Sequence, residues 1–141
     1  MKSATLSQTI FPGMRYVDAP AAINWLEKAF GFKRQSVVPG PNGTVAHAQL
    51  LFGDGGMIML GSCKKDDGFG YKTPREAGGV TQANYLYVAD IDSHFAHAKA
   101  AGAEIVIPLK NTDYGSREYS ARDPEGHLWH FGTYLPEPPA S

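Results

Sequence analysis

Residues 114–127 decide the fold, and they read YGSREYSARDPEGH. A predicted strand leads into the tetrapeptide Asp123-Pro124-Glu125-Gly126, and an apolar run follows it. Asp favours the start of a tight turn, Pro fixes one φ angle, and Gly accepts a positive φ. The stretch therefore predicts two strands joined by a turn. Turn formation accounts for both carboxylates, so we infer no catalysis from them.

A second copy of this pattern lies 71 residues earlier in the chain. At that offset Tyr16-Val17 falls on Tyr87-Val88, and Gly31 falls on Gly102. The glycine-rich turn at residues 53–56 lies one residue out of register with the turn described above. A duplicated unit with a pseudo-twofold axis predicts a ligand site between the copies.

Each copy predicts the order strand, helix, then three strands. In the first copy we expect a helix and four strands, at Ala19–Phe30 and at Ile10–Val17, Gln35–Val38, Val45–Phe52 and Met57–Leu60. In the second we expect a helix capped by Asp92, and four strands, at Ser93–Ala101 and at Asn84–Val88, Glu104–Ile107, Arg117–Arg122 and His127–Thr133. The sequence thus predicts an α+β fold with eight strands in one twisted mixed sheet and the helix pair outside.

The whole chain, residues 1–141, is predicted to form a single domain. Its parts are module one at about 9–61, a linker at 62–79, module two at about 80–134, and a proline-rich tail at 135–141. The linker is polar except for Phe69 and Tyr71, and a lid over a site is an alternative interpretation of it.

Composition excludes several classes of protein. The chain is 43% hydrophobic, and its 13 basic and 14 acidic residues show no basic stripe for nucleic acid. No apolar run is long enough to span a membrane. Cys63 is the only cysteine, so neither an intrachain disulfide nor a cysteine metal cluster can form. Because the N-terminal residues also lack the apolar stretch of a signal peptide, we expect a cytoplasmic protein.

The stretch at residues 114–127 resembles the final hairpin of the vicinal oxygen chelate superfamily. That superfamily includes glyoxalase I, extradiol dioxygenases, fosfomycin-resistance transferases and bleomycin-binding proteins. Residues 45–50 and 53–61 resemble its small bacterial members, the glyoxalase/bleomycin-resistance-like and PhnB-like group, and the resemblance extends over residues 9–134. It implies two βαβββ modules whose sheets curl into one cup, usually in a homodimer.

The resemblance also implies where a divalent metal would be held, on the first and fourth strands of each module. Carried over to this chain, these positions fall on Pro12, Met59 (or Leu60), Ala83 and His130. Only His130 carries a suitable donor, and one imidazole does not hold a divalent ion against water. The resemblance therefore implies a member that lacks the metal ligands, with no metal and no cofactor.

Seven residues are candidates for contact with a ligand in the cup. They share strand faces in pairs or lie at the carried-over position, and they are His47, Gln49, Tyr85, Tyr87, Arg117, Tyr119 and His130. An aromatic wall with a few polar groups suits a small molecule. For each tyrosine the alternative is core packing, for Arg117 a surface ion pair, and for His130 a core histidine.

Other polar and aromatic residues have simpler interpretations. His127 and His130 point to opposite faces of one strand, so they cannot share an ion. His94 and His97 are one helical turn apart, and a solvated helix face explains them better than a metal site. Trp129, next to His130 in the strand, is expected to pack in the core.

Three functions compete at this stage. The first is a metal-independent protein that binds an aromatic or antibiotic-like small molecule as a homodimer. The second is a glyoxalase- or dioxygenase-like enzyme, a lyase, isomerase or transferase, that uses a metal or a histidine acid/base, with His130 or His47 as the base. The third is a structural or regulatory dimer whose cup is filled with side chains.

Overall fold

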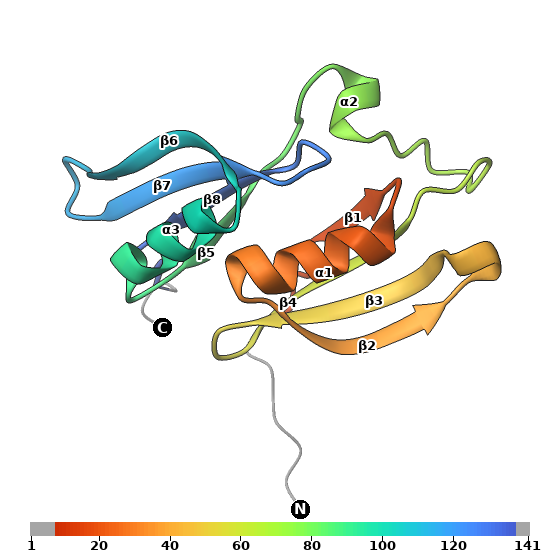
Figure 1. The fold of residues 1–141 in the computed structure, drawn as a ribbon, viewed down its shortest axis with the longest axis horizontal. Coiled ribbons are helices and arrows are strands. Elements are labelled where there is room, and N and C mark those ends of the chain that lie inside the picture. Colours follow the sequence, from red (N-terminus) through yellow and green to blue (C-terminus); the bar gives the residue numbers. More distant parts are fainter. Residues whose placement is uncertain (1–7, 138–141) are drawn as a thin grey trace, which may run out of the picture.

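The computed structural model describes residues 8–137 and confirms an α+β fold of two βαβββ modules. Figure 1 shows module one and module two next to each other. The segment that joins them carries a short helix, labelled α2. The last four residues of the predicted proline-rich tail, 138–141, lie outside the described residues. No helix within residues 8–137 is both long and apolar enough to cross a membrane.

Within residues 8–137 the strands form two four-stranded sheets and not the single eight-stranded sheet that we predicted. The first sheet has the order β1-β4-β3-β2, with bounds Gly13–Tyr16, Gly56–Ser62, Val45–Phe52 and Lys33–Pro39. The second has the order β5-β8-β7-β6, with bounds Asn84–Tyr87, Leu128–Gly132, Arg117–Arg122 and Glu104–Asn111. In each sheet the pairing of the first and fourth strands is parallel and the other pairings are antiparallel.

The first helix, α1 (Ala19–Phe30), has the predicted bounds. Asp18 caps its start by accepting a hydrogen bond from the Ala21 N–H, and Pro20 lies in its first turn, where no N–H is needed. Gly31 ends it at a φ of 84°, a left-handed conformation that glycine adopts without strain. The apolar stripe of the helix packs on the first sheet.

The second long helix, α3 (Ile91–Ala100), begins earlier than predicted. Asp90, and not Asp92, is its N-cap and accepts from the Ser93 N–H over 3.4 Å. Asp92 lies in the first turn, where its carboxylate pairs with Arg117. Two aspartates two residues apart make either cap plausible from sequence.

The predicted linker contains a helix, α2 (Pro74–Ala77). Thr73 and Glu76 form a reciprocal capping box at its start, and Gly78 ends it at a φ of 78°. Such local hydrogen bonds stabilise a single turn, which hydrophobic periodicity does not reveal.

The two modules share one core. Phe30, at the end of α1, packs on Trp129 and Phe131 of β8, with the ring centroids 5.9 and 4.7 Å apart. Phe52 at the end of β3 also approaches Phe131, at 6.3 Å. Trp129 is fully buried, as predicted. The core thus joins the helix-facing sides of both sheets. The opposite side of each sheet is here called its outward face.

Polar contacts also join the modules. The buried Tyr16 hydroxyl of β1 donates to Asp123 Oδ2 over 2.6 Å, and Trp129 Nε1 donates to the same oxygen over 3.1 Å. Burial, then the Asp123 charge, raises the pKa of Tyr16 well above its usual value. The Glu125 carboxylate accepts the Val17 and Asp18 N–H groups just before α1. The turn at residues 123–126 of module two therefore also forms hydrogen bonds to module one.

Of the two histidines of α3, His97 is exposed, as expected, whereas His94 is partly buried between the modules. His94 Nε2 lies 2.8 Å from the Phe30 carbonyl oxygen and His97 Nε2 lies 2.6 Å from that of Lys28, so both contact the last turn of α1 (Figure 1 shows the two helices side by side). His94 Nδ1 lies 2.7 Å from the Tyr119 hydroxyl. Burial lowers the pKa of His94. Backbone carbonyl groups at the end of α1 thus lie within hydrogen-bonding distance of histidines in module two.

Candidate functional site

The outward face of the first sheet carries two of the seven candidates. Because side chains alternate along β3, His47 and Gln49 point away from α1, while Ala48 and Leu50 are buried beneath it. His47 Nε2 lies 3.0 Å from Gln49 Oε1, and Gln49 Nε2 donates to Gln35 Oε1 over 2.7 Å. These residues form a polar row on the sheet surface.

The outward face of the second sheet carries three more candidates, Tyr85, Tyr87 and His130. Tyr85 is paired with His130 in the ladder of β5 and β8, so the two side chains are neighbours on one face. His130 Nδ1 lies 2.6 Å from the Ser120 hydroxyl, and a cavity of about 520 Å³ lies over both. This cavity is also lined by Ile107, Tyr114 and Glu118.

Tyr85 is fixed at the edge of this face. Its hydroxyl donates to the Tyr134 carbonyl oxygen over 2.5 Å, and it lies over Gly132, where any added Cβ would be 2.7 Å from that hydroxyl. Burial, then the Glu118 charge, raises the pKa of Tyr85. Tyr85 and Tyr87 also border an apolar cavity of about 880 Å³, which Phe30 and Phe52 line from the other module.

The remaining two candidates, Arg117 and Tyr119, lie on the helix-facing side of β7. Arg117 forms an ion pair with Asp92 of α3 at 2.9 Å and donates to Asn111 Oδ1 over 3.1 Å. Tyr119 is 1% exposed, and its ring stacks on Phe131. Burial raises the pKa of Tyr119. By alternation along β7 their side chains lie on the other side of the sheet from Ser120 and His130, although Tyr119 also borders the cavity over His130.

The seven candidates therefore do not meet in one chain. His47 and Gln49 lie on the outward face of module one, and Tyr85, Tyr87 and His130 lie on that of module two. Neither of the two cavities described above is lined by residues of both sets.

The residues at the family's metal positions do not fit a divalent ion. Pro12, Met59 and Ala83 offer no nitrogen or oxygen side-chain donor, and His130 supplies a single imidazole. No group of three or more His, Cys, Asp or Glu side chains in residues 8–137 is arranged to hold a metal.

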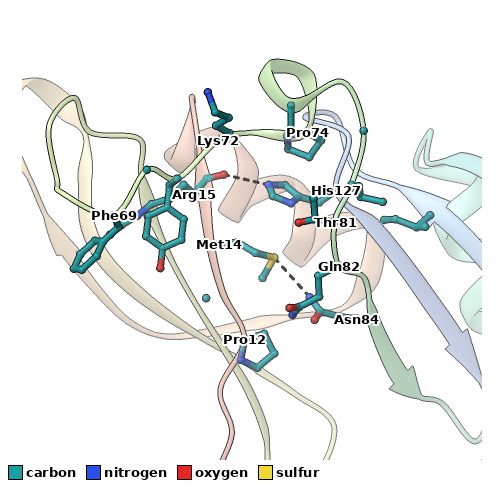
Figure 2. A pocket seen from close by; sticks show the side chains of 17 residues that line it. Pro12, Met14, Arg15, Phe69, Lys72, Pro74, Thr81, Gln82, Asn84 and His127 are labelled. Carbon is teal, nitrogen blue, oxygen red and sulfur yellow. Dashed lines mark hydrogen bonds between the residues drawn. The ribbon is translucent and has the colours of Figure 1, made fainter.

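A pocket that sequence reasoning missed lies between β1, the connecting segment and the start of β5 (Figure 2). Its volume is about 450 Å³, and it is lined from the two modules by Met14, Arg15, Gln82, Asn84 and His127, and from the connecting segment by Phe69, Tyr71 and Lys72. The only sequence signal for it was the pair of isolated aromatics in the predicted linker. That signal suggested a lid but not its position.

Arg15 is the central charged group of this pocket. Its guanidinium carbon lies 4.9 Å from the centre of the Tyr71 ring, a cation–π contact. On its other side it lies over Gly61, where a Cβ would be 2.7 Å from Arg15 Nη1. The Arg15 carbonyl oxygen lies 3.1 Å from His127 Nε2, as Figure 2 shows. The side chain thus lies between a glycine and an aromatic ring.

Comparison with known proteins identifies relatives over most of the chain. A family model described as Glyoxalase/Bleomycin resistance protein/Dioxygenase superfamily matches residues 9–131. An uncharacterized protein of Mycobacterium bovis is 34% identical over 115 residues, which is 82% of this chain and 76% of that protein.

Solved structures give the same result. The crystal structure of TioX from Micromonospora sp. ML1 is 34% identical, with a TM-score of 0.72, and the match covers 92% of this chain and 100% of that one. The fosfomycin resistance protein FosX of Mesorhizobium loti is 13% identical, with a TM-score of 0.60, over 93% of this chain and 95% of that one. The second likeness is one of fold alone.

Proposed function

The chain belongs to the glyoxalase/bleomycin resistance protein/dioxygenase superfamily, and on this premise we propose that it binds an aromatic small molecule without using a metal ion. The observation that carries the proposal is the residue set at the four metal positions. Proline, methionine and alanine stand at three of them, and a single histidine at the fourth. Apolar and aromatic side chains with few polar groups are what a small-molecule site needs.

The proposed site is completed by a second copy of the chain. The outward faces present exposed apolar side chains, since Val38 is 47%, Tyr87 43% and Ile107 40% exposed. Such surface favours association. In the proposed homodimer the outward face of module one in each copy lies against that of module two in its partner. His47 and Gln49 then face Tyr85 and His130 across a cup.

A cytoplasmic location is part of the proposal. The exposed Cys63 is the only cysteine, so the fold needs no oxidising compartment.

Binding of the neutral aromatic probe N-phenyl-1-naphthylamine tests the function by fluorescence. We expect saturable binding that dialysis against EDTA leaves unchanged, and that Tyr87→Ala weakens several-fold. Val17→Ala is the matched control, because Val17 is 72% exposed and lines none of the three cavities. Loss of binding after EDTA treatment, with recovery on adding zinc or manganese, would contradict the proposal.

The dimer has its own test. Sedimentation equilibrium should give twice the 15.2 kDa mass of the chain. A chain that stays monomeric at micromolar concentration while binding the probe as tightly would reject the two-copy cup.

One observation favours a second candidate function, a metal-free enzyme. The Ser120 hydroxyl contacts His130 Nδ1, which leaves Nε2 available to take a proton from a bound substrate. Turnover of the hemithioacetal of methylglyoxal and glutathione, abolished by His130→Gln and unaffected by EDTA, would establish this function. Absence of turnover with retained probe binding would leave the binding protein as the better description.

A further inference from the structure

The pocket of Figure 2 differs in charge from the rest of the chain. The chain as a whole has a net charge of −1, but this pocket is lined by two cationic side chains, Arg15 and Lys72, and by no carboxylate. Within residues 8–137, neither Arg15 nor Lys72 takes part in an ion pair. A guanidinium left without a carboxylate in a concave site is an available partner for an anion.

Within residues 8–137 no nearby carboxylate forms an ion pair with Arg15 or Lys72. The carboxylates on neighbouring segments accept hydrogen bonds from backbone N–H groups, and they are Asp67, Glu76 and Glu125. Each is therefore committed to a turn or a helix start. Lys72 lies at the rim of the pocket in Figure 2, where it adds attraction without a fixed contact.

The pocket also offers an aromatic wall. Phe69 and Tyr71 form an edge-to-face pair with ring centroids 6.0 Å apart, yet they remain 76% and 53% exposed. Exposed aromatic side chains on a connecting segment contribute little to the core. Opposite them, the amides of Gln82 and Asn84 supply donors. The volume of about 450 Å³ lies in the range of small-molecule sites.

We infer that this pocket binds the anionic group of an aromatic ligand, a carboxylate, sulfonate or phosphate, with Arg15 as its partner. Tyr71 and Gly61 hold the guanidinium in place, so little side-chain entropy is lost when the anion binds. Arg15 alternates along β1 with the buried Tyr16, so it lies on the outward face of module one, which is part of the proposed cup. The inference therefore rests on the proposed function, since it assigns a charge to the ligand of that function. It also excludes cationic ligands, which Arg15 and Lys72 would repel.

Two probes that differ by one anionic group test this inference. The anionic probe is 8-anilinonaphthalene-1-sulfonate, and N-phenyl-1-naphthylamine has the same aromatic skeleton without the sulfonate. We expect the wild-type chain to bind the sulfonate at least about tenfold more tightly, the scale of one charge-assisted hydrogen bond. Raising the salt concentration should weaken only the sulfonate.

Variants then identify the partner. Arg15→Gln should lower the affinity for the sulfonate about tenfold and leave that for the neutral probe unchanged, and Arg15→Lys should give an intermediate loss. Lys65→Gln is the matched control, because it removes a positive charge from the same connecting segment outside the pocket. It should change neither affinity. Unchanged thermal midpoints show that the variants are folded.

The outcomes separate the two proposals. Equal binding of both probes, or no effect of Arg15→Gln on the sulfonate, overturns the anion site and leaves the proposed function standing. Absence of binding of either probe overturns both. Tighter binding of a cationic aromatic amine than of the sulfonate also overturns the anion site.

Discussion

Replacing Tyr16 with phenylalanine removes one hydroxyl from the junction of the modules. That hydroxyl is buried and donates to Asp123 Oδ2 over 2.6 Å. Asp123 keeps three other donors, at 3.0–3.1 Å, which are Trp129 Nε1 and the backbone N–H groups of Glu125 and His127. A hydrogen bond to a charged acceptor contributes about 1.5–3 kcal/mol. Since the carboxylate loses one donor of four, we expect Tyr16→Phe to lower the free energy of unfolding by about 2 kcal/mol.

Urea denaturation followed by tryptophan fluorescence, at one fixed protein concentration, measures this difference. Tyr114→Phe is the matched control, because the Tyr114 hydroxyl also donates to a carboxylate, Glu118, over 2.7 Å, but the residue is 62% exposed. That control should change the free energy of unfolding far less than Tyr16→Phe does, because water replaces the lost partner. Equal effects of the two substitutions would refute the reasoning, because burial at the module junction would then add nothing.

The remaining predictions concern pH and backbone conformation. Because the folded-state pKa of Tyr16 is raised, its contribution is complete below about pH 10, the usual tyrosine value, and is lost as the pH rises further. Urea midpoints of Tyr16→Phe should therefore fall less steeply in alkali than those of the wild type. The lowered pKa of His94 has the opposite sign: stability is complete above about pH 6.5 and is lost as the pH falls, and His94→Gln should flatten this limb. Gly31→Ala, at a φ of 84°, should cost about 1–2 kcal/mol in thermal denaturation, whereas Gly13→Ala, in open space without a positive φ, should cost little. Equal losses at the two glycines would contradict the conformational argument.

Sequence predicted best the elements whose ends carry turn or cap residues. The bounds of α1, β3 and β7 agree with the structure because Gly31, the turn at residues 53–56 and the Asp123–Gly126 turn mark their ends. Sequence predicted β1 and β6 least well. The strand predicted at Ile10–Val17 spans only Gly13–Tyr16, and β6, predicted to end at Ile107, continues through Pro108 to Asn111. An edge strand tolerates proline, and its edge position follows from tertiary pairing.

For the candidate site as well, the sequence predicted local patterns but not tertiary contacts. Alternation along a strand predicts which side chains share a face, and it correctly grouped His47 with Gln49 and Arg117 with Tyr119. It does not say which face meets the helices, and for Arg117 and Tyr119 that is the helix-facing side. The contact of Arg15 with Tyr71 depends on the path of the connecting segment, which no local pattern contains.

The shared interior has a consequence for how such a chain can diversify. Phe30, Trp129 and Phe131 keep the halves together, while the side chains on the outward faces add little to that interior. Substitutions at His47 or Tyr87 can therefore change the proposed ligand contacts without endangering folding. Single substitutions on the outward faces can thus change the proposed ligand specificity while the fold stays the same.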